Sequence, residues 1–350
     1  MAIIDLFGND AFGLTELTDV IQYRSYVPSG LRQLGNFGVK GIYTPTATIE
    51  FGERGLKLIQ TSNRGEPLEQ LNKRDRHIRQ YNAVRVGIGS RIHANEIQFV
   101  RGFGKEKQMQ MLSEEVADRL GLGGTNGILD DIDITLERMR LGALQGKVLD
   151  ADGSVLWDWS KEFKNAVGLG GTGAIASVAF NMSPVKDGDF KKQLNTLKRG
   201  FAKQAKGVMF GQIVILCGSE FFDAVSTLPE VREANRNKPS QAMMQAGSGA
   251  YEEFTYAGFL FKEHRPDDDG DKVAIAPSEA VIFPKTSKGT LFSEYYAPAE
   301  SFSDLGKKGV ERYAQTLRDL QRNSYVDIEA MSYPLMVCKH PTLLRKGTIA

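Results

Sequence analysis

The strongest hydrophobic pattern in the chain is a helical stripe that ends at Gly146. Apolar side chains recur every three or four positions, and charged side chains lie between them. Acidic residues gather near the start and basic residues near the end, an order that suits the helix dipole. The pattern predicts one long helix that ends at Gly146, because glycine commonly follows the last helical residue. The stripe is Leu129, Ile132, Leu136, Met139 and Ala143, and the charged residues off it are Asp130, Asp131, Asp133, Glu137, Arg138 and Arg140.

A small hairpin is predicted directly after that helix. The sequence Asp-Ala-Asp-Gly at 150–153 is a polar turn, and it joins short strands at 147–149 and 154–157. Upstream of the helix, a second helical stripe is separated from the first by the glycine-rich sequence GLGGTNG at 121–127. That second stripe consists of Met109, Leu112, Val116 and Leu120.

A β-hairpin is predicted nearer the N-terminus. Residues 44–51 alternate between polar and apolar positions, 52–55 form a turn, and 56–61 form a second strand. A lone hairpin is only marginally stable in water. We therefore expect this hairpin to lie on the body of the protein or on another chain. A further strand is predicted over 77–92.

The remaining patterns predict an α+β fold. Helices are expected at 190–208, where the apolar positions follow the helical period, and at 220–227. Pro334 marks an edge or a bend in the last predicted strand, because proline cannot donate a hydrogen bond within a sheet. The predicted strands are 174–180, 212–217, 253–262, 273–276, 280–283 and 325–337.

Residues 1–37 predict an arm rather than a domain. They contain one short amphipathic segment, which Thr15 caps, and are then broken by proline and glycine. Three apolar residues remain after that break, so the arm should bind a surface. They are Leu31, Leu34 and Phe37.

The composition is that of a folded soluble protein. The 350 residues are 41% hydrophobic and 25% charged, and the 37 glycines exceed the usual share of about 7%. The net charge of +1 predicts no general attraction to nucleic acid or to anionic membranes. Cys217 and Cys338 lie in apolar runs, which favours two buried thiols in a reducing compartment over a disulfide. No secretion signal or membrane span is predicted.

One motif suggests nucleotide chemistry but lacks its context. Gly168, Gly170 and Gly173 form a GxGxxG sequence. A dinucleotide loop follows a strand and opens a helix. Here a polar, helix-like segment precedes the glycines and a possible strand follows them, so a turn-rich loop is favoured.

No catalytic, cofactor-binding or metal-binding residues are predicted, and we expect no enzyme activity. The acidic runs that begin at Asp150 and Asp267 lack the glycine or the acid that a calcium-binding EF-hand loop requires. None of the four histidines has zinc-ligand spacing with another histidine or a cysteine. No serine sits in a GxSxG sequence.

A basic cluster is the one charged feature that stands out. Three interpretations remain open for it: a solvated face, ion pairs with neighbouring subunits, and contact with nucleic acid. Aromatic residues do not alternate with the cations well enough for a base-stacking surface. The cluster comprises Arg64, Lys73, Arg74, Arg76, Arg79, Arg85 and Arg91.

An arm, a hairpin that needs a partner surface, and a body without an active site together predict an assembly protein. Three sequences then carry a resemblance. ERMRLGALQGKVLDADGSVLWDW resembles the segment from spine helix to hairpin in the lambda-type major capsid proteins of tailed phages. PLMVCKHP at 334–341 resembles the closing strand of that family. The region YTPTATIEF…LKLIQTSNRGEP is similar to its extended loop. The matching positions in the first are Glu137, Met139, Leu144, Gly146 and Lys147.

The resemblance implies the tailed-phage major capsid protein fold, also used by encapsulins. It places an N-terminal arm at 1–37 and an extended β-hairpin loop at 38–76. A peripheral domain with the spine helix is expected at 77–150, a mainly axial domain at 151–319, and C-terminal strands at 320–350 that also close the peripheral domain. The glycines at 121–127 depart from the pattern, and imply either a short spine helix or a bend.

The function implied is mechanical. Copies of the chain would form hexamers and pentamers of an icosahedral shell around double-stranded DNA. The implied partners are a scaffolding protein, a portal protein and, in some shells, a decoration protein. Alternatives are an encapsulin-like cellular shell and a nucleotide-binding enzyme that uses the Gly168–Gly173 loop. As a hypothesis, the residues that contact neighbouring subunits are Arg54, Arg64, Arg74, Arg76 and Arg79.

Overall fold

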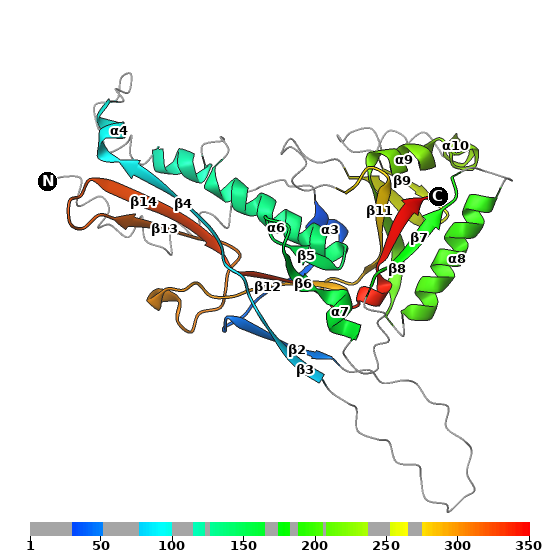
Figure 1. Ribbon diagram of the computed structural model, residues 1–350, viewed down its shortest axis with the longest axis horizontal. Coiled ribbons are helices and arrows are strands. Elements are labelled where there is room, and N and C mark those ends of the chain that lie inside the picture. The colour runs from blue at the N-terminus through cyan, green and yellow to red at the C-terminus, as the bar shows by residue number, and fades with distance from the viewer. Residues whose placement is uncertain are drawn as a thin grey trace, which may run out of the picture.

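The computed structural model shows an elongated subunit with two β-rich ends joined by a central region (Figure 1). One end holds the long helix α6 over a three-stranded sheet, and the other end holds a six-stranded sheet with its helices. The structure describes residues 30–51, 77–99, 115–122, 127–164, 174–182, 188–205, 208–236, 253–264 and 275–350. None of the described helices is long and apolar enough to cross a membrane.

The predicted long helix is confirmed as α6, Ile128–Leu144. Its first turn is closed by Asp130, whose Oδ2 accepts a hydrogen bond of 2.9 Å from the Gly127 N–H. After the last turn Gly146 has a φ of 74°, a left-handed conformation that glycine adopts without strain. Within 121–127 only 121, 122 and 127 are described. Residues 115–120 are helical and bury Val116 and Leu120, whereas Met109 and Leu112 lie outside the described residues.

The predicted hairpin after α6 is also confirmed. Strand β5, Lys147–Leu149, pairs with β6, Val155–Asp158, and α7, Trp159–Lys164, follows. The Trp159 N–H donates a 3.0 Å hydrogen bond to the Gly146 carbonyl, so the chain returns to the end of α6. The Trp159 side chain is fully buried there. The hairpin therefore fixes the helix end to the body of the protein.

The strand predicted at 77–92 is wrong as one element, because the chain changes partners within it. Strand β3, His77–Asn82, pairs with β2, Thr46–Phe51. Strand β4, Val86–His93, joins β14, Tyr325–Ser332, which also pairs with β13, Tyr313–Arg318. Between them the Ala83 N–H bonds to the Pro45 carbonyl and the Val84 N–H to the Pro334 carbonyl.

The predicted hairpin at 44–61 is confirmed in its first strand only. All six residues of β2 pair with β3, which lies 26 residues further along the chain. The predicted turn at 52–55 and second strand at 56–61 lie outside the described residues.

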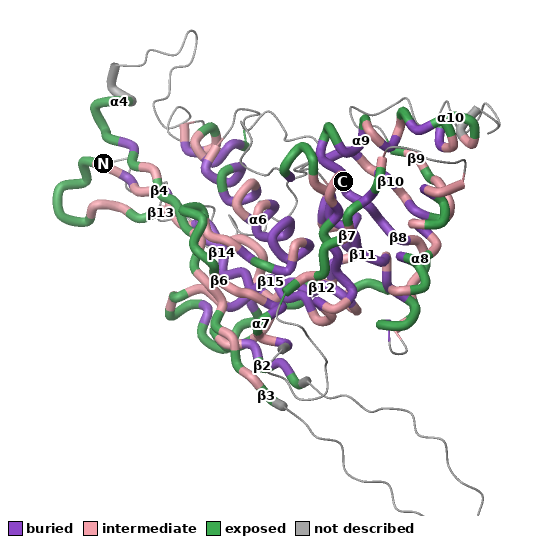
Figure 2. Tube along the Cα trace, turned by 45° about the vertical axis from the view of Figure 1, so that its right-hand side comes forward, coloured by how far each residue is buried: buried purple, intermediate pink, exposed green. Residues whose placement is uncertain are grey.

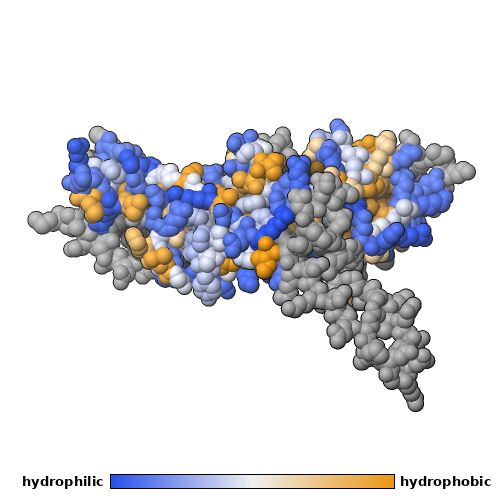
Figure 3. All heavy atoms as spheres, turned by 60° about the horizontal axis from the view of Figure 1, so that its bottom comes forward, coloured by the Kyte–Doolittle hydropathy of each residue, from blue (hydrophilic) through white to orange (hydrophobic). Residues whose placement is uncertain are grey.

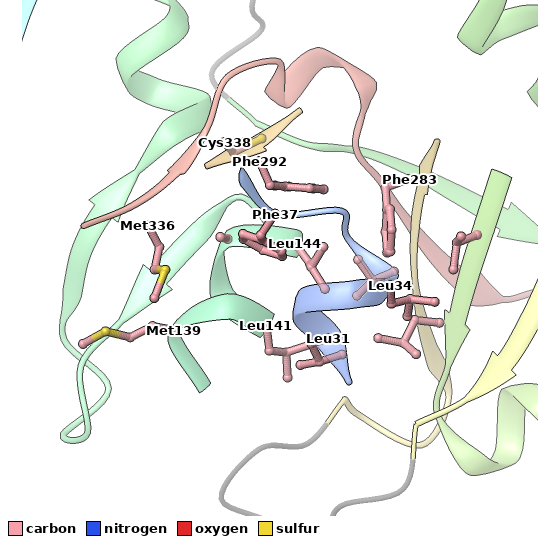
Figure 4. Close-up of a cluster of buried hydrophobic side chains, with 14 of the residues drawn as sticks. Leu31, Leu34, Phe37, Met139, Leu141, Leu144, Phe283, Phe292, Met336 and Cys338 are labelled. Carbon is pink, nitrogen blue, oxygen red and sulfur yellow. The ribbon is translucent and has the colours of Figure 1, made fainter. Parts of the chain in front are cut away.

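A second three-stranded sheet lies at the centre. Strand β1, Gly38–Gly41, runs parallel to β12, Phe292–Tyr296, which pairs with β15, Pro334–Cys338. The predicted terminal strand therefore bends at Pro334, where it passes from one sheet to the next. The arm residues Leu31, Leu34 and Phe37 are buried against this sheet and α6 of the same chain (Figure 4). Phe37 stacks on Phe292 with the ring centroids 5.0 Å apart. The short helix here is α3, Leu31–Leu34.

The six-stranded sheet has the order β7-β16-β11-β8-β10-β9. The C-terminal strand β16, Arg345–Ile349, lies between β7, Ala176–Phe180, and β11, Glu279–Thr286. The predicted strand at 212–217 is within β8, Phe210–Cys217. The strand predicted at 253–262 is split into β9, Glu253–Tyr256, and β10, Phe259–Glu263, because Ala257 and Gly258 have positive φ.

Two predicted helices cover one face of that sheet. These are α8, Asp189–Gln204, and α9, Ser219–Ser226, and Phe180 of the sheet contacts both Phe190 of α8 and Phe221 of α9. Cys217 and Cys338 are buried free thiols, as predicted. The other elements are α4, Ala94–Phe99, α10, Pro229–Arg236, η2, Phe302–Asp304, and η3, Pro341–Leu343. The predicted cap at Thr15, the Gly168–Gly173 loop, the acidic run at 267–271 and residues 273–274 of the strand predicted at 273–276 lie outside the described residues. Residues 275 and 276 are described and are not part of a strand.

Candidate functional site

Of the five arginines predicted to contact other subunits, the structure describes Arg79. This arginine lies on β3, and its Nη1 is 2.5 Å from Glu162 Oε2 on α7. The Tyr81 hydroxyl donates to the same carboxylate at 3.1 Å, and burial together with Glu162 raises the pKa of Tyr81 to about 12. The Arg79 side chain is about one-third exposed, so this ion pair stabilises the fold by at most about 1 kcal/mol. Arg54, Arg64, Arg74 and Arg76 lie outside the described residues.

Two further members of the basic cluster also face acids of their own chain. Arg91 on β4 binds both carboxylate oxygens of Asp327 on β14, at 2.6 and 2.9 Å, and lies 4.0 Å over the ring of Tyr325. Arg85 lies 3.6 Å from Glu300, and both side chains are mostly exposed. The described part of the cluster is therefore occupied by intrachain ion pairs.

A second group of charges, which the sequence did not predict, is buried where α6 crosses the central sheet. Arg140 on α6 is 4% exposed, and its Nε donates to Glu294 Oε1 at 2.9 Å. Its Nη1 donates to Glu137 Oε2, one turn back, at 2.8 Å. Glu294 on β12 is fully buried, and the Tyr296 hydroxyl donates to it at 2.8 Å. Because these groups have little access to water, each depends on the others for its hydrogen bonds.

The same network includes the base of the arm. Arg32 on α3 donates to Glu294 Oε2 at 2.8 Å and forms a second ion pair with Glu311. Glu137 accepts a hydrogen bond of 2.9 Å from the Leu31 backbone N–H. These contacts connect α3, α6, β12 and the segment before β13. We name the group the arm-base network, and its members are Arg32, Glu137, Arg140, Glu294, Tyr296 and Glu311.

Electrostatics favour the charged forms of Glu294 and Arg140 at the centre of the arm-base network. Burial alone opposes charge on Glu294, but Arg140 and Arg32 outweigh it and hold the pKa of Glu294 below its ordinary value. Burial likewise opposes charge on Arg140, and the surrounding Glu294, Tyr296 and Glu137 raise its pKa well above the ordinary value. Both shifts favour the charged forms of Glu294 and Arg140, and each of these groups lies beside charge of the opposite sign inside the protein.

A second buried pair lies nearer the start of α6. Arg312 Nε is 2.8 Å from Asp133 Oδ1, and the Asp133 side chain is 3% exposed. Neither atom has hydrogen-bond geometry, so the contact is an ion pair without a directed bond. Burial raises the pKa of Asp133 to about 6, and the attraction of Arg312 offsets this only in part.

That shift predicts how stability depends on pH. The pKa of Asp133 is higher in the folded state than the ordinary 3.8, so the folded state binds more protons between those two values. The contribution of Asp133 to stability is therefore largest below pH 4 and falls as pH rises to about 6. We expect the melting temperature of the native protein, relative to Asp133→Asn, to fall between pH 4 and pH 6.5. A constant difference between the two proteins across this range would contradict the assignment.

The arm-base network joins side chains from elements that are far apart in the sequence. Among the described residues, no three His, Cys, Asp or Glu side chains are arranged to hold a metal ion. The charged groups of the arm-base network bind one another, and Arg32 and Glu311 at its edge are partly exposed. The one sequence signal of the arm-base network was the spacing of Glu137 and Arg140, which lie three residues apart on one helix. Their other partners lie 106 to 171 residues away in sequence, so no local pattern points to them.

The chain is similar to known proteins over nearly its whole length. A family model described as phage major capsid protein E matches residues 13–349. A major capsid protein of Pseudomonas phage KPP10 is 25% identical over 355 residues, which cover 96% of this chain and 97% of that protein.

One solved structure shows the same fold at low identity, and a second is similar over most of its length. The putative capsid protein of a prophage from E. coli CFT073 is 12% identical, with a TM-score of 0.53, and the match covers 96% of this chain and 99% of that one. The capsid protein of Myoviridae phage XM1 is 11% identical, with a TM-score of 0.48, over 94% of this chain and 95% of that one.

Proposed function

Since this chain belongs to the phage major capsid protein E family, it is a structural protein of the virion capsid, and we propose how it acts there. Copies assemble as hexamers and pentamers into an icosahedral shell that encloses double-stranded DNA. The role is mechanical and involves no catalytic turnover. The family match over residues 13–349 carries this proposal, and it favours a phage shell over an encapsulin-like compartment or a nucleotide-binding enzyme.

We also propose a division of labour within the subunit. Residues 1–37 are the arm, 38–76 the extended loop, 77–150 the peripheral domain with α6 as its spine helix, and 151–319 mainly the axial domain. The packing of α6 on β4 and β14 supports a peripheral unit that also draws on 320–350. Strand β16 completes the six-stranded sheet, so the end of the chain serves the axial unit as well.

The subunit surface supports repeated contacts between copies. Figure 3 shows one face on which apolar atoms form small separate groups within a hydrophilic surface. Phe302 at the start of η2 and Leu305 directly after η2 are 95% and 74% exposed. Covering exposed apolar side chains of this size with a neighbouring subunit lowers the free energy. A scaffolding protein, a portal protein and a decoration protein are the further partners we propose.

Electron microscopy of the overexpressed protein tests the assembly, and Arg64→Glu tests the proposed arginine contacts. We expect the native protein to give shells or ring-shaped capsomers, with scaffold supplied where it is required. We expect Arg64→Glu to remain folded by circular dichroism but to give no closed shells, because like charges then oppose each other across the subunit contact.

The matched control is Arg85→Glu. Arg85 faces Glu300 of its own chain at 3.6 Å, and its side chain is 56% exposed. We expect this variant to assemble normally. Normal shells from Arg64→Glu would count against a subunit contact at that residue, and the family assignment would stand.

A further inference from the structure

Helix α8 concentrates positive charge that the described residues of its own chain neutralise only in part. Its 16 residues include five cations and one acid, whereas the whole chain has a net charge of only +1. All five cations are exposed (Figure 2). Lys192 lies 3.1 Å from Asp189, and among the described residues no acid forms an ion pair with the other four. The five are Lys191, Lys192, Lys198, Arg199 and Lys203.

The helix period arranges these cations in two stripes. Lys192, Arg199 and Lys203 are separated by seven and four residues, so they follow one line on the side opposite the buried stripe. Lys191 and Lys198 form a second line on the flank, with about 10 Å between them along the axis. The buried stripe, which fixes this orientation, is Phe190, Leu194, Leu197 and Phe201.

The chemistry of this face favours a polyanion over a protein partner. Protein interfaces are enriched in aromatic residues and methionine at their centre, and they are depleted in lysine. The exposed face of α8 carries no aromatic residue, and Ala202 is its one exposed apolar residue. The face therefore offers charge without the apolar centre of a protein contact. It also lacks the stacking platform that single strands require.

We propose that the exposed face of α8 contacts the phosphate backbone of the double-stranded DNA inside the shell, without reading its sequence. This inference rests on the proposed function, because it needs DNA to lie against the subunit. Flexible lysine side chains neutralise phosphates whatever the base sequence is. A genome that presents any sequence to any subunit needs a contact of this kind. The near-zero net charge predicted no such attraction, because it averages over a chain whose charge is unevenly distributed.

The test uses fluorescence anisotropy to measure the affinity of the full-length unassembled protein for a 30-base-pair DNA duplex. The measurement is repeated over a series of salt concentrations. The α8 variant carries Lys191→Gln, Lys198→Gln, Arg199→Gln and Lys203→Gln, since glutamine keeps helix propensity at exposed sites. The control variant removes the same charge elsewhere through Lys147→Gln, Lys161→Gln, Lys288→Gln and Lys308→Gln. Four lost phosphate contacts correspond to a change of about 3 to 4 in the slope of log K against log salt.

We expect the native and control proteins to bind alike, and the α8 variant to bind about tenfold more weakly or worse at 50 mM salt. Equal losses in both variants would overturn the proposal, because net charge alone would then explain binding. Tighter binding of polyglutamate than of DNA at equal charge would overturn it in favour of an acidic protein partner. Electron microscopy distinguishes failure of the DNA-contact proposal from failure of the proposed function. The α8 variant should still form shells, and failure of the native protein to form them would instead contradict the proposed function.

Discussion

Replacing Arg140 by methionine should destabilise the folded subunit by about 3–5 kcal/mol, the cost expected when one partner of a buried ion pair is removed. The variant leaves Glu137 and Glu294 buried without the cation that binds both of them. Arg32 remains beside Glu294, but it is one-third exposed and also serves Glu311. Urea denaturation of the unassembled protein, followed through the fluorescence of Trp157 and Trp159, measures the change.

Two further variants decide whether disruption of the arm-base network or the mere loss of an arginine causes the loss of stability. Arg138→Met alters the same helix outside the network, and we expect it to cost less than about 1 kcal/mol. The double variant Arg140→Met, Glu294→Met removes both members of the central pair. Its cost should be smaller than the sum of the two single costs by about 1–3 kcal/mol, because each single change strands the other charge. Additive costs, or a loss below about 1 kcal/mol for Arg140→Met, would contradict this account.

The network also explains how the arm is held at its root. Leu31 and Phe37 supply apolar burial, but apolar contacts alone permit neighbouring positions of similar free energy. Arg32 and the Leu31 N–H add directed bonds to Glu294 and Glu137, and these fix one register of α3 on α6. In the shell that we propose, residues 1–37 are an arm toward neighbouring subunits, and the register of α3 sets where that arm begins. We therefore expect Arg140→Met to impair assembly even where the variant remains folded.

Elements with a strong local period were predictable from the sequence. The stripe on α6, the glycine that ends it and the polar turn of the β5–β6 hairpin each lie within a few residues of one another. The stripe of α8 gave that helix for the same reason. In each case the residues that decide the structure are neighbours in sequence, so pattern and propensity are enough.

Features that depend on distant partners were not predictable. The residues of β3 and β4 form one strand-like pattern, but β3 pairs with β2 and β4 with β14, more than 230 residues away. The insertion of β16 between β7 and β11 is equally invisible along the chain. The arm-base network was not predictable for a similar reason. Charged residues that lie off the apolar stripe of a helix normally face water, so burial of this group was not expected. Glu137 and Arg140 are buried because Glu294 and the arm cover that side of α6.

Gly142→Ala should destabilise the subunit by about 1–3 kcal/mol, the range expected for overpacking, although alanine is the better helix former by about 1 kcal/mol. Gly142 lies in α6 where the hairpin crosses it. A Cβ atom there would lie 2.7 Å from the Lys147 carbonyl oxygen and 3.0 Å from the Val148 Cα. Both are backbone atoms, so relief requires the hairpin to move away from the helix.

Gly200→Ala in α8 is the matched control. The same substitution is made in a helix of similar length, at a position where the added Cβ has no neighbour. No heavy atom lies within 4 Å of a Cβ at that position. Propensity then acts alone, and we expect a gain of about 0.5–1 kcal/mol. Urea denaturation of both variants measures the contrast. Opposite signs at the two glycines would show that close packing of the hairpin, rather than chain flexibility, requires glycine at 142, whereas a gain at both would refute the close contact between α6 and β5.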